Sequence, residues 1–98
     1  MSSSASNLVE AARDLLLICR ALNEPSPAEQ VLQSQDQTKA TLIASAYSAV
    51  AEALELAANV QRAPNRYGLD AVVGALVALM LRRVARELEV EADRWDQT

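Results

Sequence analysis

Eleven apolar or small residues in succession, from Ala71 to Leu81, constrain most strongly how this 98-residue chain can fold. A membrane-spanning helix needs about 20 apolar residues, so this run crosses only about half of the hydrocarbon layer. Asp70 precedes the run and two arginines follow it, which fixes its length. The run therefore predicts a buried helix, and we expect no association with a membrane.

The composition favours helices along the whole chain. Nineteen residues are alanine, Phe is absent, and Gly and Pro together number five. Alanine is the best helix former, whereas Gly and Pro are the main helix breakers. A chain of this length forms one small domain that buries a modest share of its surface, so it gains stability from a partner. We expect an all-α protein with a core of small side chains.

The first helix is predicted at about residues 8–22. Asn7 and Glu10 have the spacing of a capping box, and the apolar residues that follow recur every three or four positions. Asn23 can adopt the left-handed conformation of a helix cap, and Pro25 prevents the helix from continuing.

A second helix start follows directly, where SPAE at residues 26–29 places Ser at the N-cap and Pro at the first helical position. The polar residues after it offer little to a core, so we expect only a short helix near 27–33. Either Asp36 or Thr38 can cap the next helix.

An alanine-rich helix is predicted from Lys39 to about Arg62. Its apolar residues lie alternately four and three positions apart, as in the seam of a coiled coil. The predicted seam residues are Ile43, Tyr47, Val50, Leu54, Ala57 and Val60 or Gln61. Residues 63–68 then form a turn by composition.

The last helix is predicted over residues 69–95, about 39 Å long at 1.5 Å per residue. Asp70 suits its N-terminus. The first half is apolar on all sides, whereas the second half carries a single apolar stripe of Val84, Leu88, Ala92 and Trp95.

Together these helices predict a small all-α bundle of three main helices, at about 8–22, 39–62 and 69–95, with a short helix near 27–33. Residues 1–6 are predicted to be a disordered lead-in, residues 7–95 a single helical domain, and residues 96–98 a short tail.

The apolar run has only two other long helices to cover it. Two neighbours at 8–10 Å cover about two-thirds of a helix's circumference, so a helix that is apolar all round keeps an exposed stripe. Large exposed apolar patches mark association sites. We therefore predict a homo-oligomer in which Gly74, Ala75 and Ala78 let the stripe approach another backbone. The predicted interface residues are Val72, Ala75, Leu76, Leu79, Arg82, Arg86 and Trp95.

Arg82, Arg83 and Arg86 form a small basic patch that either pairs within its own helix or contacts an acidic partner. Trp95 either packs on its own subunit or docks into a neighbour, because large aromatic side chains are enriched among interface anchors.

No catalytic, cofactor-binding or metal-binding constellation is predicted. The chain has no histidine, and its one cysteine, Cys19, cannot form an internal disulfide or a thiolate zinc site. The apolar neighbours of Cys19 predict a small buried side chain. Two glycines are too few for a glycine-rich phosphate loop. We expect a non-enzymatic protein without cofactors.

The densest acidic cluster is Glu87, Glu89, Glu91 and Asp93. A carboxylate metal site is the less favoured interpretation, because such sites in helical bundles take carboxylates from several helices and add histidines. A solvated face with Arg83–Glu87 and Arg86–Glu89 pairs is favoured.

The net charge is −4, and no segment is a basic arm. Duplex binding depends on Lys and Arg that neutralise phosphates, so a helix-turn-helix protein or another sequence-specific nucleic-acid binder is disfavoured.

Three segments in order carry a resemblance to a known family. NLVEAARDLLLICRALNEPSPAEQVLQSQ gives a helix, a Pro-containing turn and a second capped start, and ATLIASAYSAVAEALELA gives a long helix. APNRYGLDAVVGALVALMLRRVARELEVE then places a Pro and a Tyr-Gly before an apolar helix. This order, over residues 7–90, resembles the phage head-to-tail adaptor (packaged-DNA stabilisation) proteins, although many of these carry a longer loop between the second and third helices.

The resemblance implies a virion protein that forms a ring of copies beneath the portal and receives tail proteins below. An acidic ring would let DNA pass without binding to it. The competing interpretation is a cytoplasmic regulatory or inhibitory module that acts as a dimer through protein–protein binding and needs the same apolar stripe.

Overall fold

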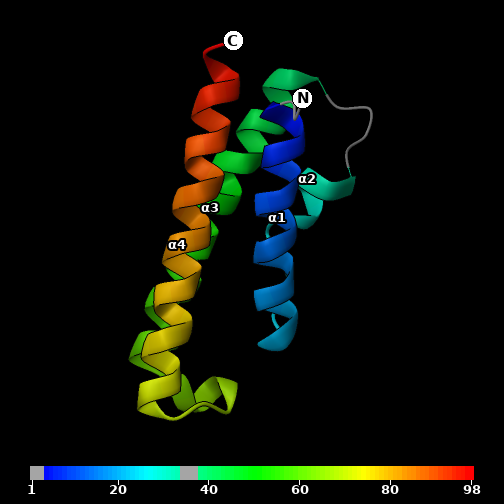
Figure 1. The fold of residues 1–98 in the computed structure, drawn as a ribbon. Coiled ribbons are helices and arrows are strands. Elements are labelled where there is room, and N and C mark those ends of the chain that lie inside the picture. The colour runs from blue at the N-terminus through cyan, green and yellow to red at the C-terminus, as the bar shows by residue number, and fades with distance from the viewer. Residues whose placement is uncertain (1–3, 34–37) are drawn as a thin grey trace.

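The computed structural model describes residues 4–33 and 38–98, and within these ranges the protein is helical without strands (Figure 1). The predicted all-α bundle is confirmed, and it measures 42 × 21 × 20 Å. Its elements, in chain order, are α1 (Ser4–Ala21), α2 (Glu29–Gln33), α3 (Lys39–Arg62), the 3₁₀ helix η1 (Pro64–Tyr67) and α4 (Ala71–Asp96).

Helix α1 begins at Ser4, four residues earlier than predicted. No Gly or Pro separates Ser4 from Asn7, so the helix continues back past the capping-box residues, and Asn7 lies inside it. Residues 4–6 of the predicted lead-in are therefore helical, while residues 1–3 lie outside the described ranges. At the other end, Asn23 adopts the predicted left-handed conformation, with φ 57°.

Helix α2 begins at Glu29, two residues later than predicted. The Ser26 hydroxyl accepts a hydrogen bond from the Ala28 backbone N–H at 3.1 Å, which orders a turn before the helix. Of the two predicted caps for the next helix, Asp36 lies outside the described residues. Thr38 caps α3, because its side chain accepts from the Thr41 backbone N–H at 3.3 Å.

Helices α3 and α4 form an antiparallel hairpin joined by η1 (Figure 1). Each helix buries residues alternately three and four positions apart, the heptad spacing of a coiled coil. On α3 these are Ile43, Ala46, Val50, Ala53, Ala57 and Val60, and on α4 they are Gly74, Ala78, Leu81, Ala85, Leu88 and Ala92. The small side chains among them let the two backbones approach closely.

The predicted seam of α3 was wrong at two positions. Ala46 and Ala53 are buried, whereas Tyr47 is half-buried and Leu54 is exposed. The sequence spacing fits either set, but a close approach to α4 favours the face with the smaller side chains.

Gly74 faces inward, which corrects the prediction that it lies against another chain. A Cβ atom on Gly74 would lie 2.6 Å from the Pro64 Cβ and 3.4 Å from the Val60 carbonyl oxygen. Ala78 is likewise buried within the subunit. Only a glycine lets α4 begin this close to η1.

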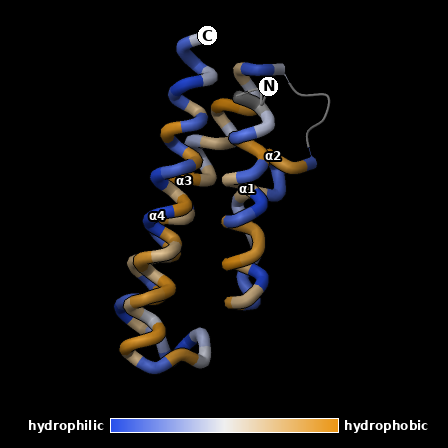
Figure 2. Tube along the Cα trace, in the orientation of Figure 1, coloured by the Kyte–Doolittle hydropathy of each residue, from blue (hydrophilic) through white to orange (hydrophobic). Residues whose placement is uncertain are grey.

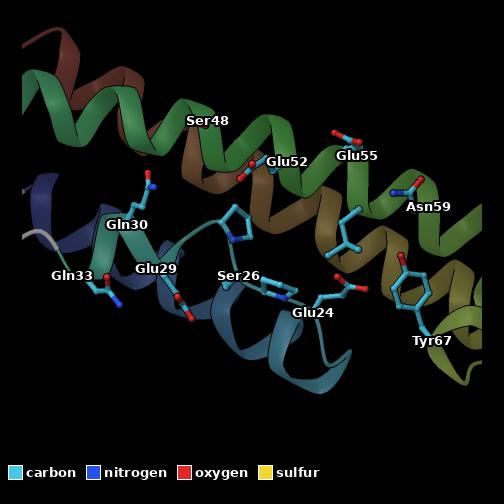
Figure 3. A pocket seen from close by; sticks show the side chains of 13 residues that line it. Glu24, Ser26, Glu29, Gln30, Gln33, Ser48, Glu52, Glu55, Asn59 and Tyr67 are labelled. Atoms are coloured by element: carbon cyan, nitrogen blue, oxygen red, sulfur yellow. The ribbon is translucent and has the colours of Figure 1, made fainter.

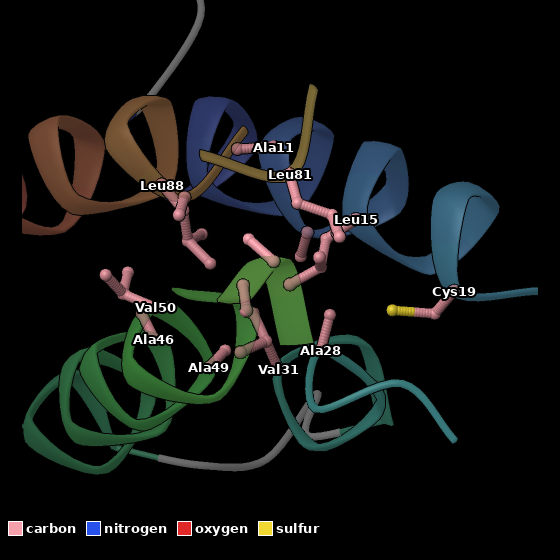
Figure 4. Packing of buried hydrophobic residues seen from close by; sticks show 14 of the residues in the cluster. Ala11, Leu15, Cys19, Ala28, Val31, Ala46, Ala49, Val50, Leu81 and Leu88 are labelled. Atoms are coloured by element: carbon pink, nitrogen blue, oxygen red, sulfur yellow. The ribbon is translucent and has the colours of Figure 1, made fainter. Parts of the chain in front are cut away.

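Helices α1 and α2 cover one side of the hairpin and complete the core (Figure 4). Leu15 on α1, Val31 on α2 and Leu88 on α4 are among the buried residues that meet there. The start of α1 and the end of α4 lie at the same end of the bundle, and α1 ends before it reaches η1 (Figure 1). The covering of the hairpin is therefore incomplete at its η1 end.

The predicted tail over residues 96–98 belongs to the end of α4. Asp96 is its last helical residue, and the Thr98 hydroxyl donates to the Trp95 carbonyl at 2.8 Å. The Lys39 ammonium at the start of α3 donates to the same Thr98 oxygen at 3.4 Å. The bond from Lys39 therefore joins the start of α3 to the residues that follow α4.

One further bond joins the two helices near this end, where the Tyr47 hydroxyl donates to the Asp93 carboxylate. That hydrogen bond, followed by desolvation and the charge of Asp93, raises the pKa of Tyr47 from 10 to about 12. The fold thus favours the neutral phenol.

Replacing Tyr47 with Phe should lower the thermal unfolding midpoint at neutral pH and remove a step in its dependence on pH. Because the pKa of Tyr47 is raised on folding, its contribution is complete below pH 10 and disappears as the pH rises towards 12. The difference between the two proteins should therefore close over that interval, as followed by circular dichroism. Tyr67→Phe is the control, and a difference that persists at pH 12 would contradict the assignment.

Cys19 is fully buried, as predicted. Burial raises the pKa of its thiol, a hydrogen bond with Ser26 opposes this, and the charge of Glu24 adds to the rise. Both accessibility and thiolate content are therefore low. We expect a water-soluble disulfide reagent to modify the native protein at least about a hundredfold more slowly than the urea-unfolded chain, which corresponds to an opening free energy of about 3 kcal/mol. Equal rates would show that this end of α1 is open.

Candidate functional site

Most of the exposed large apolar side chains in the described residues lie on the outer face of α4. Five large apolar side chains are exposed in its first three turns. These residues, here called the outer stripe, are Val72, Val73, Leu76, Leu79 and Met80. Figure 2 shows that the η1 half of α4 carries most of the hydrophobic colour of this helix.

Three of the predicted interface residues thus lie exposed on one helical face. Val72 is 71% exposed, Leu76 56% and Leu79 62%. Their spacing of four and three residues places them on the side of α4 opposite the buried seam. Ala75 is also exposed, next to Leu76.

The same face continues into basic residues. Arg83 and Arg86 extend the four-and-three spacing of the outer stripe, and both are exposed. Neither makes a hydrogen bond or an ion pair in the described part of the chain. Arg82 differs, because its guanidinium donates to the Gln61 side-chain oxygen on α3 at 2.6 Å.

The predicted pairs Arg83–Glu87 and Arg86–Glu89 do not form. Within the described residues the ion pair present is Arg94–Glu91, at 3.2 Å. Two arginines of the basic patch are therefore available to groups outside the subunit.

Trp95 lies apart from this surface. It is half-buried and packs against the core of its own subunit. Of the two predicted positions for Trp95, the structure shows the one on its own subunit, and the outer stripe is not continuous with it.

A groove of about 700 Å³ lies on another side of the molecule (Figure 3). The turn after α1, helix α2, helix α3 and η1 all contribute to it. Its lining residues, here called the acidic groove, are Glu24, Pro25, Ser26, Pro27, Glu29, Gln30, Gln33, Ser48, Glu52, Glu55, Leu56, Asn59 and Tyr67.

All charged side chains that line the acidic groove are negative. Its lining includes four carboxylates and no Lys or Arg. None of these carboxylates forms an ion pair in the described ranges. Arg62, which follows the groove along α3, donates to the side-chain oxygen of Asn59 at 2.7 Å. Four unpaired carboxylates around one hollow favour a cationic occupant.

Sequence reasoning missed this groove. Glu24 and Glu29 lie beside Pro25 and Pro27, whereas Glu52 and Glu55 lie more than 20 residues further on. The available signal was the pair at positions 52 and 55, which share one face of a helix that has no basic residue between Lys39 and Arg62.

A smaller hollow of about 300 Å³ separates α1 from α4, lined by Asn7, Glu10, Ala11, Asp14, Glu87 and Glu91. One Glu91 carboxylate oxygen is buried there without a hydrogen-bond partner. Across the described residues, no group of three or more His, Cys, Asp or Glu side chains is placed to hold a metal ion.

Helix α3 is long and apolar enough, by length and composition, to cross a membrane. One such helix is weak evidence, because the core helix of a bundle passes the same test. Glu52 and Glu55 lie near its middle, where a carboxylate strongly opposes insertion, and the opposite face packs on α4. These features favour the core interpretation.

Comparison of the chain with protein-family models, with curated proteins and with solved structures finds no match.

Proposed function

We propose that this protein is a non-enzymatic assembly protein that self-associates through the outer stripe of α4 and acts as a ring-forming phage head-to-tail adaptor between portal and tail proteins. The observation that carries the proposal is the exposure of five large apolar side chains on one helix of a chain in which half of the buried core residues are alanine. Monomeric proteins rarely leave such a patch uncovered without a use for it.

The energetics of the stripe indicate an assembly with more than one contact. Full burial of a Val, Leu or Met side chain contributes about 1.5–3 kcal/mol, so burying the exposed parts of five of them contributes about 4–8 kcal/mol. Association costs about 4–15 kcal/mol in lost motion. The stripe alone therefore supports weak pairing, and stable assembly requires further contacts or a template.

The adaptor interpretation specifies which assembly the protein forms, namely a ring between the portal and tail proteins of a phage. It is supported by the order of helices and turns over residues 7–90, which resembles the adaptor proteins. It is also supported by the net charge of −4, because a channel lined by carboxylates does not retain DNA. A template such as a portal would supply the contacts that the stripe lacks.

Sedimentation velocity and negative-stain imaging of the purified protein, alone and with a candidate portal, test this proposal. We expect closed rings, or co-purification with the portal. A compact dimer that does not bind the portal would overturn the adaptor proposal in favour of a regulatory module. A monomer at tens of micromolar, both alone and with the portal, would contradict self-association itself.

A further inference from the structure

The outer stripe and the acidic groove have complementary properties. The α4 face is apolar and then basic, with Arg83 and Arg86 exposed and unpaired. The groove holds four carboxylates that are also unpaired among the described residues. Complementary charges on two surfaces of one molecule can pair only between copies, unless the surfaces meet within the subunit.

In this subunit they do not meet. No residue of α4 lines the acidic groove. The carboxylates come from the turn after α1, from α2 and from α3, whereas the stripe and its arginines come from α4 alone. Each copy can therefore offer both surfaces at the same time.

We propose that copies of this protein associate head to tail, with the outer stripe, Arg83 and Arg86 of one copy seated in the acidic groove of the next. This proposal rests on the self-association part of the proposed function, and it specifies which two surfaces form the contact between copies. Such an interface is heterologous, and its repetition closes a ring or extends a filament.

The dimensions of the two surfaces agree over most of their length. Along α3 the groove runs from Ser48 to Asn59, about 17 Å at 1.5 Å per residue. The α4 face from Val72 to Arg86 spans about 21 Å by the same rise, and its part from Leu76 to Arg86 spans about 15 Å. The charged residues on the two surfaces have the same spacing. Arg83 lies three residues before Arg86, and Glu52 lies three residues before Glu55, so about one helical turn separates the two members of each pair.

The groove also offers apolar contacts to the stripe. Its lining includes Leu56, which is half-buried, and also Pro25 and Pro27. A helix seated there would cover apolar and charged groups together, which supplies the contacts that the stripe alone lacks.

A symmetric contact between two α4 stripes is the alternative arrangement. It would bury the outer stripes of both copies against each other, but it would leave all four groove carboxylates without partners. The head-to-tail arrangement pairs the two arginines of one copy with the groove carboxylates of the next. The charges therefore favour this arrangement over the symmetric one.

Charge reversal tests the proposal. One variant carries Arg83→Glu and Arg86→Glu, and the other carries Glu52→Arg and Glu55→Arg, all at exposed helical positions. Each variant alone should self-associate at least about tenfold more weakly, because like charges then face each other across the interface. Mixing the two variants, or combining all four substitutions in one chain, should restore assembly in sedimentation velocity.

Arg13→Glu with Arg20→Glu is the matched control for the α4 reversal, since both arginines are exposed on α1 and both variants change the net charge by the same amount. This control should associate as the wild type does. Circular dichroism verifies that each variant is folded.

The outcomes separate the two proposals. If the α4 reversal weakens assembly but the groove reversal does not, or if mixing fails to restore it, the head-to-tail contact is wrong while self-association stands. A wild-type chain that stays monomeric, alone and with a candidate portal, overturns both.

Discussion

Replacing Leu79 with Asp should leave each subunit folded and abolish its self-association. Leu79 is 62% exposed in the subunit, so the new carboxylate stays in water and the fold loses little. In an assembly that covers the outer stripe, the same carboxylate is buried without a partner, which costs several kcal/mol. A loss of about 3 kcal/mol raises the dissociation constant more than a hundredfold.

Leu81 provides the matched comparison, because it lies two residues away and is fully buried in the α3–α4 seam. Leu81→Asp should prevent folding, as shown by loss of the helical circular dichroism signal. Sedimentation velocity and thermal unfolding of both variants separate the two effects. If Leu79→Asp unfolds the subunit, or if it assembles as the wild type does, the outer stripe is not the interface.

The helix boundaries that the sequence predicts well depend on local hydrogen bonds. Thr38 and Asp70 each accept from a backbone N–H three residues later, at 3.3 and 2.8 Å, and Asn23 adopts its left-handed cap. Such contacts involve residues that are neighbours in the chain, so their residue types are sufficient to predict them. The start of α1 was missed because nothing in residues 4–6 stops a helix.

The choice of helix face depends on distant residues and was less predictable. On α3 a rotation of the buried face by one position exchanges Tyr47 and Leu54 for Ala46 and Ala53. Only the close approach of α4 decides between these faces. The same holds for Gly74, which the sequence alone could not place against Pro64.

The outer stripe was predictable for a different reason. A run of eleven apolar residues forms a helix that is apolar on all sides. Two neighbouring helices cannot cover its whole circumference, whichever face lies against them. The run therefore predicted that a stripe remains exposed, and Leu76 and Leu79 are exposed in the structure. The acidic groove was not predictable in this way, because the bundle topology is needed to bring Glu24 near Glu52.

Replacing Ala78 with Leu should destabilise the subunit strongly, because Ala78 is fully buried where α4 approaches α3. Three additional carbon atoms in a close-packed seam force the helices apart, at a cost of about 1–3 kcal/mol. For a domain of this size, that lowers the thermal unfolding midpoint by about 5–20 °C. Thermal unfolding followed by circular dichroism, at a concentration where the protein is monomeric, measures the change.

Ala75→Leu is the control for this substitution, since it makes the same chemical change three residues away at an exposed position. It should alter the free energy of unfolding of the monomer by no more than about 0.5 kcal/mol. Because Ala75 lies next to Leu76, the added side chain enlarges the outer stripe and should strengthen self-association. Equal destabilisation by both substitutions would show that the small residues of α4 do not set its distance from α3.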